Sequence, residues 1–175
     1  MDPRCYLIGG ITMKPFSDFV ATVYPFLENV LYSIALYKTI SDRIYQDVFI
    51  DVCQRELWVN VINNSIQMAV IDWCKVFGSD YENPFHYSRN CDFQIEGIDS
   101  VKEKMTRFRN KYIAHKTTVD VPVPSLNEAT NVIFAFDKEI RKKSDLDGYP
   151  TFQETYESCQ IRIEDLLDRY HIGEI

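Results

Sequence analysis

Apolar residues recur at helical spacing along much of this chain, and this periodicity limits its fold more than any other feature. Over residues 16–34 they fall three or four positions apart, the pattern of an amphipathic helix with one buried face. Proline removes a backbone donor and crowds the preceding turn, so Pro25 predicts a kink or a break in this helix. A second helical stretch, in one piece or two, is predicted over about residues 42–77, because Gly78 suits the end of a helix.

Local start signals predict three further helices. The capping-box pattern Ser100-Val-Lys-Glu103 begins the third helix, which we expect to run to about His115. The same pattern at Ser125-Leu-Asn-Glu128 begins the fourth. A turn-forming composition over residues 147–150 then predicts a separate last helix over about residues 151–170.

The composition is that of a folded domain rather than a disordered chain. Hydrophobic residues make up 46% of the 175 positions and only 6 are glycine. Four to five long helices and no convincing alternating strand predict an all-α bundle, with residues 1–175 forming a single domain. The stretch 78–97 has no sustained periodicity, and an irregular segment of this length is more often a functional or lid-like loop than a plain connector.

Several kinds of site and location are disfavoured by the sequence. The five cysteines are scattered without C-x-x-C spacing, and there is no P-loop, no G-x-G-x-x-G and no cluster of metal ligands. We therefore expect no cofactor and no metal. The N-terminal residues lack a basic segment followed by a long apolar run, and no uncharged apolar stretch reaches about 18 residues. These features predict a cytoplasmic protein that does not associate with membranes.

Positive charge is concentrated in one short part of an acidic protein. Residues 101–116 contain six Lys or Arg and one Glu, a net charge of +5, whereas the whole chain carries -7. Within this part, the sequence FRNKYIAHK places Arg109 and His115 six residues apart. In a straight α-helix these two side chains would lie about 120° apart around the axis and about 9 Å apart along it. Either the helix unwinds before His115, or two copies of the segment face one another and share one site.

The same residues resemble a known family. RNKYIAH, residues 109–115, is similar to the arginine, polar residue, spacer and histidine signature of HEPN domains. With Lys116 it looks like the abortive-infection subgroup, and so does Asp72-Trp-Cys-Lys-Val-Phe-Gly-Ser79 followed by His86-Tyr87. The resemblance implies an HEPN-like helical bundle, and many such bundles are metal-independent endoribonucleases that dimerise to complete their site. It also implies a bacterial defence or toxin–antitoxin setting, RNA as substrate, a homodimer, and an antitoxin or defence protein as partner.

Carried over by position, the resemblance makes Arg109 and His115 the catalytic pair and Asn110 the polar residue that supports them. Cleavage of RNA without a metal needs a base for the 2′-hydroxyl proton and a cation for the charge on the phosphorane oxygens. A histidine with an ordinary pKa near ~6.5 can serve as base and then as acid. An arginine, permanently charged and fork-shaped, suits a phosphate.

Other residues are predicted to assist this site. Lys111, Lys116 and Arg107 are expected to contact the RNA backbone, which positions RNA without reading its sequence. Asp72 and His86 are predicted to be supporting residues. Asp72 is expected to form a structural salt bridge, and three candidate partners remain open: Arg107, Arg109 and Lys75.

Two simpler interpretations stay open. Charged residues at a helix end are usually a solvated face, and a histidine there suits the helix dipole. The aromatic residues around His86 could stack on unpaired bases, but such residues more often pin a loop onto a bundle. The functional alternative is a non-catalytic HEPN bundle that binds a nucleotide or a partner protein.

Overall fold

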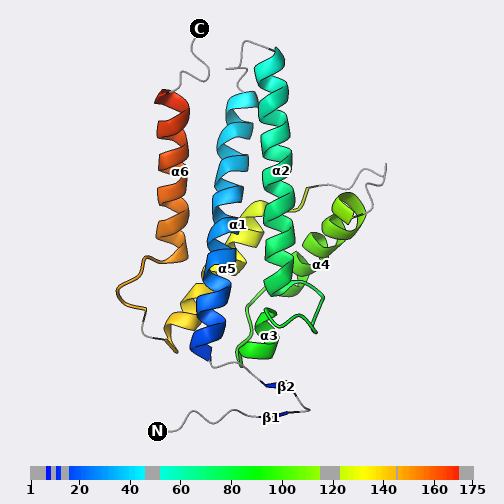
Figure 1. Ribbon diagram of the computed structural model, residues 1–175, viewed down its shortest axis with the longest axis vertical. Helices are drawn as coiled ribbons and strands as arrows, with labels where there is room; N and C mark the ends of the chain where they lie inside the picture. The colour runs from blue at the N-terminus through cyan, green and yellow to red at the C-terminus, as the bar shows by residue number, and fades with distance from the viewer. Residues whose placement is uncertain are drawn as a thin grey trace.

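The computed structural model is a bundle of α-helices (Figure 1). It describes residues 7–8, 11–12, 16–45, 52–114, 123–144 and 146–169. The helices are α1 (Phe16–Tyr45), α2 (Val52–Phe77), the single turn α3 (Tyr87–Asn90), α4 (Ile98–Phe108), the π-helix η1 (Arg109–Ala114), α5 (Leu126–Arg141) and α6 (Phe152–Arg169). The predicted all-α class is confirmed, with one addition. Two strands of two residues each, β1 (Leu7–Ile8) and β2 (Ile11–Thr12), form an antiparallel pair.

Helix α1 is the centre of the bundle. It packs along α2 on one side and α6 on the other, while α5 crosses behind it and α4 leaves the lower end of α2 at an angle (Figure 1). The helix is continuous through Pro25, so of the predicted kink or break the break is wrong, and the kink stays a prediction. The helix also runs on to Tyr45, so the second helix begins later than predicted, at Val52. Continuity is possible because one missing donor leaves the neighbouring hydrogen bonds of a long, buried helix in place.

The core is built on the apolar face that the sequence predicts. Val23, Leu27 and Val30 of α1 are fully buried, and they meet an aromatic group from α2 and α5. The ring of Phe136 packs edge-on against Phe77, with 5.2 Å between the ring centroids. Among the described residues, α1 is also the one helix long and apolar enough to cross a membrane, a test that the buried core helix of a soluble protein passes equally.

Helix α2 ends where predicted, at Gly78. The backbone N–H of Gly78 donates to the carbonyl oxygen of Cys74 across 3.0 Å. A Cβ at this position would lie 2.4 Å from that same oxygen, closer than any carbon can approach. Glycine is therefore required here for close approach of the backbone, and the chain can turn into the loop that follows.

The start of α4 differs from the prediction. Ser100 lies inside the first turn, and the residue before the helix is Gly97, whose φ of 75° is in the left-handed region that favours glycine. The capping-box prediction at residues 100–103 is therefore wrong. The predicted box at the start of α5 is confirmed on the serine side, because the Ser125 hydroxyl accepts a hydrogen bond from the N–H of Glu128 at 3.3 Å.

Candidate functional site

The predicted catalytic segment lies on a π-helix rather than an α-helix. α-Helical structure ends at Phe108, and residues Arg109–Ala114 continue as η1. A π-helix bonds residue i to residue i+5, is rare in proteins and occurs frequently at functional sites. The predicted separation of Arg109 and His115 assumes an α-helix throughout, and that assumption does not hold over the described part of the segment.

Two of the three predicted catalytic residues contact each other. The Nε of Arg109 donates to the Oδ1 of Asn110 across 3.0 Å. Arg109 is half-buried and Asn110 is exposed. This bond holds the guanidinium in one orientation at the surface, where its remaining N–H groups can meet an anion. The third predicted catalytic residue, His115, and the predicted RNA contact Lys116 lie outside the described residues.

Arg109 lies beside α2 and close to the thiol of Cys74. Burial raises the pKa of Cys74 to about 11, and the Arg109 charge opposes this rise without overcoming it. The thiol is therefore protonated at neutral pH and is not a nucleophile. Of the Cys74 thiol and the Arg109 guanidinium, only the guanidinium is charged at neutral pH, so Arg109 is the candidate group in this part of the surface.

The basic residues of this region divide into two groups. Lys102 forms an ion pair with Asp99 at 2.9 Å, and Lys104 forms one with Glu128 of α5 at 2.8 Å. Their charges are largely offset by these carboxylates. Farther along, Arg107 and Lys111 are exposed at the end that carries η1. Arg109 lies between these two exposed residues in the sequence.

An exposed aromatic ring adjoins these cations, and the sequence analysis did not single it out. Tyr112 is 41% exposed and stacks on Phe108, with 4.9 Å between centroids and 23° between ring planes. One face of the Tyr112 ring is thus fixed by Phe108, and an aromatic ring fixed beside basic side chains can stack on an unpaired base. The spacing of four between Phe108 and Tyr112 is the signal that could have found it.

Asp72 is buried, with 6% of its surface exposed, and its ion-pair partner is Lys75 at 2.7 Å. Of the three predicted partners, the structure selects the one on the same helix. The Lys75 ammonium also lies over the ring of Phe26, 5.1 Å from its centroid. Asp72 thus joins α2 to α1 through Lys75 and stands apart from Arg109.

His86 is a buried anchor of the loop over residues 78–97. Its side chain is 1% exposed; Nε2 donates to the carbonyl oxygen of Gly78 at 2.8 Å, and Nδ1 accepts from the N–H of Ser88 at 3.2 Å. Burial lowers the pKa of His86, because a charged ring would lose solvation and its Nδ1 would face a donor. The ring lies between Tyr81 and Tyr87. Tyr87 packs against Phe77 of α2, with 5.7 Å between centroids, as expected of an aromatic residue that pins the loop, whereas Tyr81 is 54% exposed.

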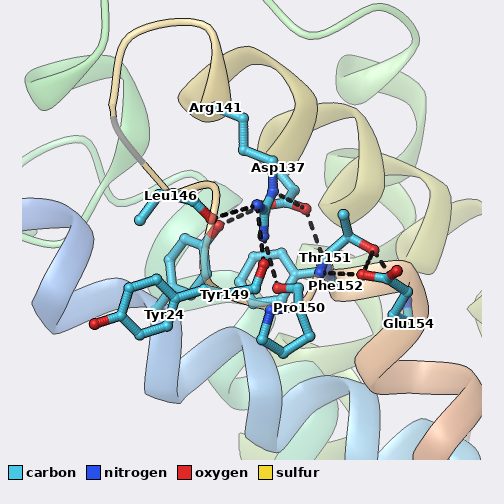
Figure 2. Close-up of polar contacts among 9 residues, drawn as sticks. All are labelled: Tyr24, Asp137, Arg141, Leu146, Tyr149, Pro150, Thr151, Phe152 and Glu154. Carbon is cyan, nitrogen blue, oxygen red and sulfur yellow. Dashed lines mark hydrogen bonds and ion pairs between the residues drawn. The ribbon is translucent and has the colours of Figure 1, made fainter.

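A second polar cluster, missed by the sequence analysis, lies at the junction of α1, α5 and α6 (Figure 2). The carboxylate of Asp137, a residue 3% exposed, accepts from the Tyr24 hydroxyl, from Arg141 Nε at 3.1 Å to each oxygen, and from the N–H of Phe152 at 3.0 Å. Arg141 also donates to carbonyl oxygens of the α5–α6 turn, those of Leu146, Tyr149 and Pro150. Burial and the neighbouring carboxylate raise the pKa of Tyr24.

Every carboxylate oxygen of this cluster is occupied by a donor from the protein itself. A buried ion pair with its hydrogen bonds satisfied fixes the packing of the elements that it joins. We therefore interpret the Asp137 cluster as a structural junction and η1 as the candidate site.

Comparison with known protein families, with curated proteins and with solved structures finds no match to this chain. The resemblance to HEPN domains therefore rests on the motif residues alone.

Proposed function

We propose that this protein is an HEPN-like bundle that acts as a metal-independent endoribonuclease in the bacterial cytoplasm, in a defence or toxin system. The observation that carries the proposal is the π-helical segment Arg109–Ala114. It combines an arginine that is hydrogen-bonded to Asn110 with exposed polar residues, in the most basic stretch of sequence of an otherwise acidic protein.

The residues of this segment suit the chemistry. His115 would take the proton from a ribose 2′-hydroxyl, and the resulting oxygen would attack the adjacent phosphorus. As the bond from phosphorus to the 5′-oxygen breaks, a protonated histidine would return a proton to that leaving oxygen. The products are a 2′,3′-cyclic phosphate and a 5′-hydroxyl, so all atoms and protons balance. Arg109, held by Asn110, would stabilise the negative oxygens of the phosphorane.

Substrate binding would fall to the neighbouring residues. Arg107, Lys111 and Lys116 would contact phosphates, and Tyr112 would stack on a base. None of these contacts reads sequence directly. The proposed active form is a homodimer in which each copy brings one Arg109 and one His115 to a shared groove, with an antitoxin or defence protein as a further partner.

The test uses the full-length protein and total RNA in the presence of EDTA. Arg109→Ala and His115→Ala should each lower the cleavage rate by at least roughly 100-fold, since a general base or a charge-stabilising group supplies about that much. Arg162→Ala is the matched control, because it removes the same charge from an exposed position on α6. It should cleave like the unaltered protein.

Mixing the two inactive variants tests the shared site. Dimers that contain one copy of each variant keep one Arg109 and one His115, and the mixture should regain part of the activity. Equal cleavage by all variants, or no cleavage by the unaltered protein, would refute the nuclease and favour the bundle that binds a nucleotide or a partner protein.

A further inference from the structure

An open pocket of about 650 Å³ lies between the start of α1 and the α5–α6 turn, and no residue of η1 lines it. We name it the Tyr149 pocket. Its two walls are mostly apolar or aromatic: Phe16, Val20, Ala21 and Tyr24 of α1, and Leu146 and Tyr149 of the turn. Pockets that bind small molecules have volumes of this order and are lined mainly by such side chains. The Tyr149 pocket therefore has the size and the lining of a ligand site.

The Asp137 cluster holds both walls of the Tyr149 pocket in place (Figure 2). On the α1 side, the Tyr24 hydroxyl donates to the Asp137 carboxylate. On the other side, Arg141 donates to the carbonyl oxygens of Leu146, at 3.0 Å, and Tyr149, at 3.2 Å. Walls that are fixed before a ligand arrives need not be ordered when it binds, which favours binding. The cluster thus shapes a pocket as well as joining three helices.

The Tyr149 ring has no structural role in the described part of the chain. Only its backbone carbonyl bonds to Arg141, and the residue is 68% exposed. Single exposed aromatic residues are common on protein surfaces, but this one faces two further rings across a pocket, those of Phe16 and Tyr24. Rings gain energy from stacked and edge-on contacts beyond the area that they bury, so three rings favour a planar aromatic ligand.

The charges at the Tyr149 pocket are already paired. Lys143 is the one charged residue among the described residues of the lining. Its ammonium is bonded to Asp92 and lies over the ring of Phe93, 5.5 Å from the centroid. Behind the walls, Arg141 is paired with Asp137. An ionised ligand group would lose its water here without gaining an unpaired counter-ion, so the lining favours an uncharged ligand.

Two serines supply polar groups for such a ligand. Ser17 and Ser144 also line the pocket, and neither hydroxyl bonds to a described residue. A hydroxyl both donates and accepts, so either serine can bond to an uncharged oxygen or nitrogen of a ligand.

We propose that the Tyr149 pocket binds an uncharged, planar aromatic small molecule. The ligand ring packs between Tyr149 on one wall and Phe16 and Tyr24 on the other. Its polar atom bonds to Ser17 or Ser144. The proposal is independent of the nuclease proposal, because no residue of the pocket belongs to α4 or η1.

The test compares two fluorescent probes that share one ring framework. N-phenylnaphthylamine is uncharged, whereas anilinonaphthalenesulfonate carries a sulfonate on the same rings. Titration of the full-length protein should give the uncharged probe a Kd at least roughly tenfold lower than that of the anionic probe. Tighter binding of the anionic probe, or no binding of the uncharged one, would overturn the proposal. Indole should displace the uncharged probe at lower concentrations than decanol, which has no ring, and the reverse order would overturn the aromatic class.

Tyr149→Ala should raise the Kd of the uncharged probe by at least roughly tenfold, because it removes one wall. It should leave the urea midpoint unchanged, because the ring makes no contact on which the fold depends. Tyr32→Ala is the matched control, since Tyr32 is 49% exposed on α1 and does not line the pocket. This variant should bind the probe like the unaltered protein.

Ala21→Trp tests the same pocket by filling it. Ala21 is exposed on α1, so the larger side chain should be tolerated by the fold and should abolish probe binding. Asn29→Trp, at an exposed position farther along the same helix, should bind the probe like the unaltered protein. If Tyr149→Ala and Ala21→Trp both keep the unaltered Kd, the probe binds elsewhere and the proposal is wrong.

Discussion

Replacing Asp137 by alanine should be among the most damaging single changes in this protein. The Asp137 carboxylate is the common acceptor for α1, for α5 and for the start of α6, through Tyr24, Arg141 and Phe152 (Figure 2). The residue is 3% exposed, so water cannot replace the lost acceptor without opening the junction.

The size of the effect follows from the groups left behind. The Tyr24 hydroxyl and the Phe152 N–H each lose a buried acceptor, which costs about 1–3 kcal/mol for each group. Arg141 loses its counter-ion but keeps three carbonyl acceptors in the α5–α6 turn, so its share is smaller than that of a bare buried charge. The sum falls at about 4 kcal/mol, within the range of about 3–5 kcal/mol for breaking a buried ion pair. A loss of this size should lower the Tm by roughly 10 °C.

The measurement is urea denaturation followed by far-ultraviolet circular dichroism. Asp137→Asn keeps the shape and one acceptor oxygen, and should lose about half as much stability as the alanine variant. Asp165→Ala is the matched control, because Asp165 is exposed on α6, and it should change stability by no more than about 0.5 kcal/mol. If Asp137→Ala unfolds within about 1 kcal/mol of the unaltered protein, the cluster does not hold the three helices together.

Two further predictions concern the loop that follows α2. Burial lowers the pKa of His86 below its ordinary value of 6.5, so the unfolded chain takes up a proton at a higher pH than the folded chain does, and stability should fall as the pH drops below about 6.5. Urea midpoints measured between pH 8 and 5 should depend less on pH in His86→Gln than in the unaltered protein. Parallel curves for the two proteins would contradict this. Gly78→Ala should lower the free energy of unfolding by about 1–3 kcal/mol, because the added Cβ would press on the Cys74 carbonyl oxygen. Gly148→Ala is the control, because no heavy atom lies within 4 Å of the added carbon, and it should change the urea midpoint little. Equal midpoints for the two variants would count against the steric argument.

The parts of the fold that depend on periodicity could be predicted from the sequence. The buried face of α1, the end of α2 at Gly78 and the start of α5 at Ser125 all follow from local rules. The errors arise where packing in the bundle outweighs a local rule. Pro25 is a helix breaker by type, but it lies in a helix whose neighbouring turns are buried, and tertiary packing outweighs the loss of one hydrogen bond.

The start of α4 shows the same limit. The pattern over residues 100–103 predicts a start three residues later than the Gly97 at which the helix is capped. The structure uses the glycine, whose positive φ turns the chain into the helix and places Ile98 and Val101 in the core. The choice depends on which residues the rest of the bundle buries, and one segment of sequence does not contain that information.

The sequence shows where the basic residues of the candidate site lie along the chain, but not how their charges are balanced in the fold. Six Lys or Arg residues among the sixteen residues 101–116 predict a cationic patch, and a sequence count gives each of them the same weight in the net charge. In the folded chain Lys104 is paired with Glu128, which is 24 residues away and reaches it only because α5 packs near α4. Lys102 is similarly paired with Asp99. Both pairings depend on the folded chain, so the sequence count of basic residues overstates the positive charge that the lysines of α4 offer to a ligand.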